Sequence, residues 1–235
     1  MKRAAAIIGL LFLTCGFSAR SAAGQSAPRP APPVERLGAN LFRVGQIRVD
    51  TAKREITVQG SVNDVTVLEF VANTKAGFKA YESALTIDTD AVTFNTALVL
   101  IGLDKAHARP PEQHFDSRTP EGDLVEVWIE WGVEPARRRV RAEQLLFDKV
   151  TNQPVPDGPW VYTASMFLAD GRYLAELDGT LVGFVHSPAP IIESSRGAGL
   201  GNYGSIVLNP NLGLTPNMPV TLTVKAIGQS AGGRR

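Results

Sequence analysis

The chain has 235 residues, of which 24 are lysine or arginine and 23 are aspartate or glutamate, so its formal net charge at pH 7 is +1. This near balance excludes the strongly basic surface that nucleic-acid-binding proteins use, and we predict no nucleic-acid partner. Cys15 is the single cysteine. The sequence therefore excludes a disulfide framework, a thiolate zinc site and an iron–sulfur cluster, and it predicts no cofactor.

Residues 1–24 have the pattern of a secretory signal peptide. Lys2 and Arg3 precede the apolar run AAAIIGLLFLT, which is too short to be a stop-transfer helix. Ala22 and Gly24 supply the small side chains that favour cleavage before Gln25. We therefore expect an exported protein, periplasmic or secreted, whose net charge becomes −2 once cleavage removes three basic residues and no acid.

A lipid anchor on Cys15 is the alternative to a soluble exported protein. Lipoprotein signals normally place leucine and small residues just before the modified cysteine. Here Leu13 lies one place too close and Thr14 is adjacent to the cysteine. The sequence therefore favours the soluble form and keeps the anchored form as the weaker interpretation.

The remaining chain divides into a linker, a domain and a tail. Residues 25–36, QSAPRPAPPVER, are rich in proline and poor in large apolar side chains, which predicts an extended linker. Residues 37–228 have a suitable length for one β-rich domain, and residues 229–235 read as a flexible tail. No segment after the signal is long and apolar enough to span a membrane.

Short runs of β-branched residues with alternating polarity, separated by Gly, Pro, Asn and Asp, predict an α+β fold that is mainly β, with antiparallel, sandwich-like sheets. In residues 123–131, DLVEVWIEW, the face that carries Val125, Val127, Ile129 and Trp131 should be buried. Asp-Gly pairs at 170–171 and 178–179 predict hairpin turns, and hence a three-stranded meander over residues 160–187.

Residues 89–102 break this strand pattern and predict one buried helix packed against a sheet. Asp88 or Thr89 can cap its start, its large apolar residues share one stripe, and Gly102 follows the apolar run. A buried strand is the competing interpretation, because the segment also contains valine and threonine, which are mediocre helix formers.

An ordered set of short motifs is similar to the YdjY-like family of exported bacterial proteins. The set comprises RVDTAKREITVQGSVN, AYESAL, the apolar helix ending in IGL, a tryptophan-rich strand and WVYTASMF, and the resemblance runs from about Ile47 to Val224. It implies a location in the cell envelope but no particular reaction. Some members carry ferredoxin-type labels, which do not suit this chain because it has no cysteine outside the signal.

The loop KAHARPPEQHFDSRTPEGD offers candidate metal ligands. Two imidazoles with nearby carboxylates can bind zinc or another divalent ion. Nothing in the spacing enforces this, so an ordinary polar loop is the competing interpretation. The candidate ligands are His107, Glu112, His114 and Asp116.

Glu82 and Ser83 are the candidate catalytic residues, since we place them at the end of a strand just before the helix. A serine nucleophile needs a base and an oxyanion donor. The surrounding sequence lacks the G-x-S-x-G elbow. The competing interpretation is that both side chains satisfy backbone groups at a turn.

Aromatic residues of neighbouring strands are candidate ligand-binding residues, together with the glycine-rich loop RGAGLGNYG over residues 196–204. This loop lacks the Lys-Ser/Thr partner of a phosphate loop. Core positions are the competing interpretation for most of the aromatics. The basic run from Arg137 to Arg141 reads as a charged strand edge rather than an anion-binding patch. The candidate aromatics are Trp128, Trp160, Tyr162, Tyr173 and Tyr203.

These observations favour a non-catalytic exported module that binds an envelope protein or a small ligand. The alternative is a metal-dependent or serine-type hydrolase that uses Glu82, Ser83, His107 and His114. A purely structural envelope component that associates with itself is a third possibility.

Overall fold

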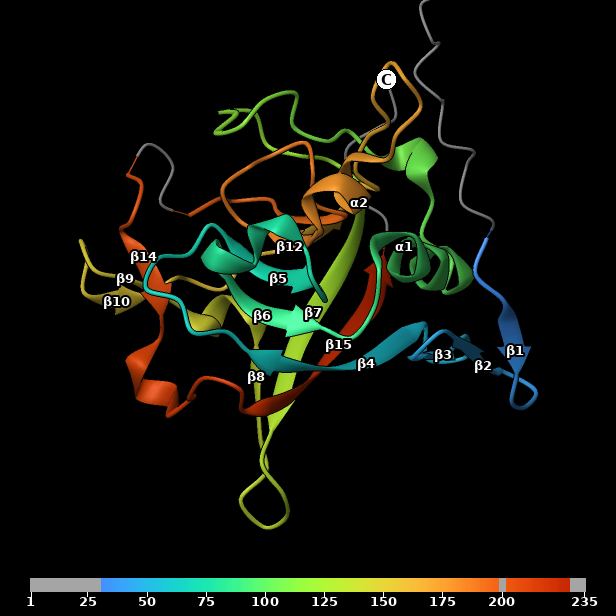
Figure 1. The fold of residues 1–235 in the computed structure, drawn as a ribbon, viewed down its shortest axis with the longest axis horizontal. Coiled ribbons are helices and arrows are strands. Elements are labelled where there is room, and N and C mark those ends of the chain that lie inside the picture. The colour runs from blue at the N-terminus through green and yellow to red at the C-terminus, as the bar shows by residue number, and fades with distance from the viewer. Residues whose placement is uncertain (1–30, 199–201, 229–235) are drawn as a thin grey trace, which may run out of the picture.

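The computed structural model describes residues 31–198 and 202–228 (Figure 1). The expected signal peptide, with Cys15, and the expected tail lie outside the described residues. So do residues 25–30 of the linker and residues 199–201 of the glycine-rich loop.

Eight strands form a closed barrel in the centre of the molecule. Closure occurs at β4 (Glu55–Val62), which pairs with β15 (Pro219–Gly228) on one side and with β6 (Ser83–Ile87) on the other. The order around the barrel from β15 to β6 is β15, β7 (Asp123–Trp131), β11 (Trp160–Tyr162), β13 (Ile192–Ser194), β12 (Thr180–Gly183), β5 (Phe70–Thr74) and β6.

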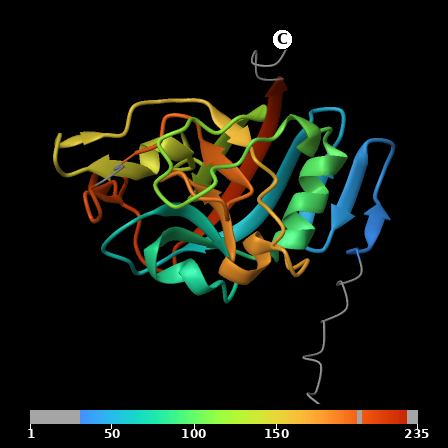
Figure 2. The same cartoon turned by 90° about the horizontal axis from the view of Figure 1, so that it is seen from above.

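Further strands extend the barrel and form a second sheet, and these two additions lie at opposite ends of the molecule (Figures 1 and 2). The extension consists of β1 (Val34–Arg36), β2 (Leu41–Val44) and β3 (Ile47–Asp50) on β4, and β8 (Arg138–Arg141) pairs with β7. The second sheet has the order β10 (Gln153–Pro154), β9 (Leu146–Asp148), β14 (Ile206–Leu208).

The helical segments are short and connect the strands. They are η1 (Phe78–Glu82), α1 (Ala91–Leu100), η2 (Lys105–His107), η3 (Ala142–Leu145), α2 (Leu174–Asp178) and η4 (Pro210–Leu212).

The mainly β fold with few helices is as predicted, whereas the sandwich arrangement is wrong, because the large sheet closes on itself. Gly60 makes the closure possible: a Cβ on this residue would lie 2.4 Å from the backbone oxygen of Thr86 on β6. Only a residue without a side chain allows β4 and β6 to approach this closely. The predicted antiparallel pairing holds for the other strand pairs of the described residues, whereas β5–β6 and β12–β13 are parallel.

The alternation in β7 is confirmed. Val125, Val127 and Ile129 are completely buried and Trp131 is nearly so, while the residues between them are half-buried. Long pairings with β15 fix this register, so the apolar face of β7 contributes to the barrel core.

The buried helix is confirmed as α1, which packs against β2, β3, β12 and α2 (Figure 2). Its cap differs from the prediction, because Asp90, rather than Asp88 or Thr89, accepts a hydrogen bond from the backbone N–H of Thr93 at 2.7 Å. Gly102 follows the helix in a left-handed conformation with φ of 87°.

The predicted meander over residues 160–187 is wrong. The second of its strands is the helix α2, and β13 lies between β11 and β12 in the sheet. The reason is that Gly179, with φ of 76°, terminates α2 and donates a hydrogen bond to Ala175 instead of forming a hairpin turn. The preceding Leu-Ala-Glu-Leu favours a helix by its intrinsic propensity.

Ordered pairing begins three residues before the expected start of the domain. β1 starts at Val34, within the segment expected to be linker, and pairs antiparallel with β2. An ion pair between Glu35 and Arg43 at 3.4 Å bridges the two strands. β1 is therefore an exposed edge strand paired with β2, rather than part of a free linker.

Candidate functional site

A small pocket lies where the barrel meets the second sheet, and it has a volume of about 160 Å³. β11 and β13 of the barrel, β9 of the second sheet, η3 and residues 196–198 all contribute to its lining. Its walls are largely apolar. Leu146, Val155 and Phe184 form part of the walls, and Glu143, Trp160 and Arg196 contribute polar groups.

Trp160 is held on the buried side of this pocket by strand pairing. It lies opposite Ser194 of β13 and Val125 of β7, and only 1% of the residue is exposed. Its indole Nε1 is buried and has no hydrogen-bond partner among the described residues. An unpaired buried donor of this kind costs free energy, about 1–3 kcal/mol, unless a ligand or a water molecule accepts from it.

Glu143 is the second buried polar group of the pocket, and its two carboxylate oxygens have different surroundings. Oε1 accepts hydrogen bonds from Arg141 Nη2 at 2.8 Å, from Arg141 Nε at 3.0 Å and from the backbone N–H of Gly158 at 3.2 Å. Oε2 is buried and has no partner among the described residues. The carboxylate of this pocket-lining residue therefore has one oxygen without a hydrogen-bond partner.

Arg141 compensates the charge of Glu143. Burial disfavours the charged guanidinium, but its hydrogen bond and charge attraction with Glu143, together with the charge of Glu126, outweigh this and raise the pKa of Arg141. Glu143 and Arg141 thus form a fixed ion pair behind the pocket.

Arg196 lies on the solvent side of the pocket, since its side chain is exposed whereas Trp160 and Glu143 are buried. Its methylene groups pack beside Gly158, where an added Cβ would lie 3.0 Å from Arg196 Cδ. Within residues 31–198 and 202–228, Arg196 forms no ion pair. The guanidinium of Arg196 is therefore an unpaired positive charge on the solvent side of the pocket.

The segment that carries Arg196 covers the pocket. Ala198 donates a backbone hydrogen bond to Phe184 at 2.8 Å, which fixes residues 196–198 over the barrel wall. The sequence predicted that Trp160 and the glycine-rich loop contribute to ligand binding, and both line this pocket. Arg196 was included only as the first residue of that loop, and Glu143 was not predicted, although an acid inside the run VRAEQLLF, between an arginine and apolar residues, is a usable signal for a buried carboxylate.

The other predicted aromatics lie elsewhere and do not form a common platform. Trp128 faces outward from β7, with the guanidinium groups of Arg139 and Arg141 at 4.6 and 5.5 Å from its ring centroid. Tyr162 is buried and donates to Asn95 Oδ1 at 2.6 Å, and Tyr173 donates to the Ala164 oxygen at 3.0 Å. Tyr203 is 67% exposed.

Residues 138–141 of the basic run form the edge strand β8, which pairs with β7 among the described strands. Two of its arginines contact Glu130, Arg139 at 3.2 Å and Arg137 in a closer pair. These ion pairs and the stacking on Trp128 occupy the arginines, as expected for a charged strand edge.

Glu82 and Ser83 lie at a junction between two elements. Glu82 ends η1 and Ser83 begins β6, so the strand follows these residues instead of preceding them. Glu82 pairs with Lys79, and the completely buried Ser83 donates its hydroxyl hydrogen to the Lys79 backbone oxygen at 2.7 Å. Ser83 thus satisfies a backbone group at this turn.

The two loop histidines contact different carboxylates. His107 Nδ1 lies 2.8 Å from Asp123 Oδ1, and His114 Nε2 lies 3.3 Å from Glu69 Oε2. Across the part of the chain that the structure describes, no hydrogen bond links either imidazole to Ser83. The four residues named for hydrolysis are not joined into one hydrogen-bonded chain.

The predicted metal ligands are also distributed over separate contacts. Glu112 and Asp116 both bind Arg118, at 3.0 and 2.7 Å. The hydrogen bonds from Arg118 hold the pKa of Asp116 well below its usual range. Among the described residues, no group of three or more His, Cys, Asp or Glu side chains comes together closely enough to hold a metal ion.

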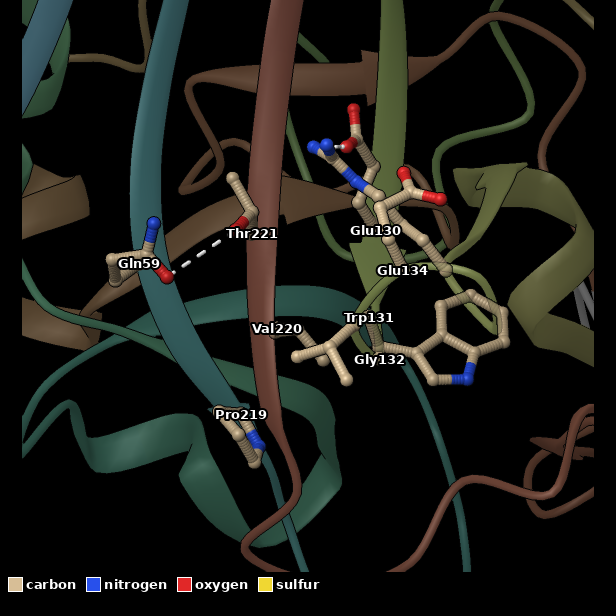
Figure 3. Close-up of a pocket in the computed structure, with 10 residues that line it drawn as sticks. Gln59, Glu130, Trp131, Gly132, Glu134, Pro219, Val220 and Thr221 are labelled. Carbon is tan, nitrogen blue, oxygen red and sulfur yellow. Dashed lines mark hydrogen bonds and ion pairs between the residues drawn. The ribbon is translucent and has the colours of Figure 1, made fainter.

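A larger, more open pocket of about 410 Å³ lies beside the turn between β7 and β8 (Figure 3). Two of its polar contacts are already made, since Thr221 donates to Gln59 at 3.2 Å and Glu130 pairs with two arginines, while Glu134 is exposed. Because two residues that line the smaller pocket each carry a buried polar atom without a partner, we assign the candidate site there.

Fold and pocket together define a closed β-barrel domain with a small pocket at its side. The chain belongs to the YdjY family, because the family model described as the YdjY domain matches residues 47–203. The matched residues include every side chain of the pocket, whereas the barrel strand β15 lies beyond them. Comparisons with curated proteins and with solved structures give no match.

None of the helices in the described ranges has both the length and the hydropathy needed to cross a bilayer.

Proposed function

We propose that this protein is an exported binding module of the cell envelope that holds a small ligand in the pocket between the barrel and the second sheet. One observation carries the proposal: Trp160 Nε1 and Glu143 Oε2, a donor and an acceptor, are both buried without partners on residues that line the same pocket. Mostly apolar walls with a few polar groups are typical of ligand sites.

The chemistry of the two buried groups supports binding rather than catalysis. The carboxylate of Glu143 is held by Arg141, and the indole of Trp160 is not a nucleophile or a base. Both groups suit recognition through hydrogen bonds. Export is supported by Lys2, Arg3 and the apolar run that follows.

Thermal unfolding in the presence of a library of small polar fragments tests the binding function. A ligand at 100 times its Kd stabilises the folded state by about 2.7 kcal/mol, which raises the Tm of a protein of this size by about 5–10 °C. We expect Trp160→Phe, which keeps an aromatic but smaller ring and removes the donor, to reduce this shift. Trp128→Phe, on the outer face of β7, is the matched control and should keep it.

A library that produces no Trp160-dependent shift would count against the binding function. A shift retained in Trp160→Phe but lost in Trp128→Phe would move the site to the outer face of β7.

A further inference from the structure

We propose that His186 is a proton-dependent clamp that attaches the loop between α1 and β7, residues 101–122, to the barrel, and that a rise in pH releases this loop. The clamp would operate whether or not the pocket holds a ligand.

The α1–β7 loop is long for a connection within a compact domain. Its regular structure consists of the short turn η2 and one bridge between Arg109 and Glu121. Residues between these two line an open space of about 540 Å³, so the loop is not packed tightly on itself. In Figure 2 the loop, drawn in green, lies beside the orange segments around β12 and β13. Loops of more than about 15 residues without regular structure of their own commonly serve as lids.

His186 joins this loop to the barrel through both nitrogens of its ring. Nδ1 lies 2.9 Å from the backbone oxygen of Asp116 in the loop, and Nε2 lies 3.0 Å from the backbone oxygen of Ser194 on β13. Only 2% of His186 is exposed, so water has little access to the ring. Its φ of 57° is a left-handed conformation that is uncommon for residues with a side chain and persists where the surrounding fold imposes it.

These two contacts require a positively charged ring. A carbonyl oxygen can only accept a hydrogen bond, and only the protonated imidazole has a hydrogen on both nitrogens. The neutral ring would place a lone pair against one of the two oxygens. β13 is fixed by pairing with β11 and β12, so the loop is the part that separates. The attached loop thus binds one more proton than the released loop, and its attachment weakens as the pH rises.

The acids around the clamp titrate outside the range in which an imidazole ordinarily changes charge, which is near pH 6.5. Asp116 pairs with Arg118 at 2.7 Å, and the hydrogen bonds from Arg118 hold the pKa of this carboxyl well below its usual range. Glu193 of β13 accepts a hydrogen bond from the backbone N–H of Ser187 at 3.1 Å, and burial raises the pKa of Glu193 to about 8.

The other two histidines of the chain lie in the loop itself and make weaker demands on protonation. His107 contacts Asp123 and His114 contacts Glu69, and in each pair the imidazole side chain is about 40% exposed. A neutral ring with one N–H can make either contact, and ion pairs with an exposed member contribute little to stability. His186 is therefore the histidine whose contacts depend on its second proton.

The test follows the protonation of His186 and the attachment of the loop from about pH 5 to about pH 8. Selective ¹⁵N labelling of histidine shows whether each ring nitrogen carries a hydrogen, and His186→Asn identifies the resonances by their loss. Hydrogen exchange of peptides from residues 109–121, relative to the unfolded chain at each pH, reports the attachment. We expect His186 to lose one of two ring hydrogens as the pH rises, and the protection of these peptides to fall about tenfold or more, because one charge-assisted hydrogen bond is lost.

Two histidine variants assign the effect to His186. Asparagine tolerates the left-handed conformation but does not titrate and is too short to bridge the two oxygens, so the loop of His186→Asn should be weakly protected at every pH. His114→Gln removes a half-exposed histidine of the same loop, is the matched control and should keep the response. If His186→Asn does not fold, His107→Gln and His114→Gln assign the other two histidines and leave His186 as the third.

Parallel loss of one ring hydrogen and of loop protection supports the clamp. A ring that carries a single hydrogen at every pH would overturn it, as would constant protection of residues 109–121 over this range. A fall in protection that persists in His186→Asn, or that disappears in His114→Gln, would also overturn it, because the response would then belong to another group.

Discussion

Glu193 is a buried acid that the sequence did not single out. It lies on β13, is completely buried, and accepts a hydrogen bond from the backbone N–H of Ser187 at 3.1 Å through Oε1, while Oε2 has no partner among the described residues. Burial disfavours the carboxylate and raises the pKa of Glu193 to about 8. At neutral pH the folded protein therefore keeps this side chain protonated.

This proton links the stability of the protein to pH. The unfolded chain releases the proton near pH 4.3, whereas the folded protein keeps it up to about pH 8. Between these values the folded state binds more protons, so the free energy of unfolding falls as the pH rises, by a total on the order of 5 kcal/mol, and levels off above pH 8.

Glu193→Gln removes the titrating group and keeps the shape of the side chain. We expect the stability of the variant relative to wild type to increase steadily from pH 5 to pH 8. Urea unfolding of both proteins at several pH values measures this difference, in which all other titrating groups cancel. Parallel stability curves would show that Glu193 does not carry the proton.

At the scale of single residues, the sequence predicted Trp160 but not the state of its neighbours. A tryptophan in a β-branched run is visible as a candidate in the sequence itself. The unpaired Oε2 of Glu143 is not visible in the sequence, because it results from the fold, in which Arg141 and the Gly158 backbone both donate to the other oxygen. Such asymmetry depends on three-dimensional packing, which a local pattern does not contain.

At the scale of the elements, local patterns predicted those elements whose form is decided locally. The 3.6-residue stripe of α1 and the alternation of β7 both matched the structure. The Asp-Gly pair at 178–179 did not, because the same dipeptide suits a hairpin turn and the end of a helix. The residues before this pair favour a helix, and the segment forms the helix α2.

The closure of the barrel through Gly60 is tested by Gly60→Ala. The new Cβ would lie 2.4 Å from the Thr86 oxygen and 2.7 Å from Ile87 Cδ1. Since the first of these contacts is backbone, β4 and β6 must separate, and we expect a loss of about 3 kcal/mol in the free energy of unfolding. Urea denaturation measures the loss.

Gly228→Ala at the end of β15 is the matched control, because a Cβ there meets nothing within 4 Å. It should be neutral or slightly stabilising, since alanine restricts the unfolded chain. Equal effects of the two substitutions would contradict the role of Gly60 in closing the barrel.

At the scale of the whole molecule, the sequence predicted the class of fold but not its topology. A barrel and a sandwich can be built from the same alternating strands, and the difference is whether β4 reaches both β15 and β6. β4 and β15 are separated by more than 150 residues along the chain. No turn signal or periodicity specifies such a distant pairing.

The proposed export concerns the whole chain, and the positive charge, the apolar run and the small residues before Gln25 support it. We expect the protein expressed in a bacterium with its own leader to be found outside the cytoplasm, with a mature mass that starts at Gln25. Intact mass spectrometry of the periplasmic and membrane fractions measures both the location and the cleavage point.

Cys15→Ala separates soluble from anchored export, because a lipid can be attached only to the thiol of that residue. We expect the variant to be cleaved and located like the wild type. A wild-type protein that begins with a lipid-modified Cys15 in the membrane fraction, together with an uncleaved variant, would establish the anchored form. An uncleaved wild-type chain in the cytoplasm would overturn export, and the pocket would then have to meet its ligand inside the cell.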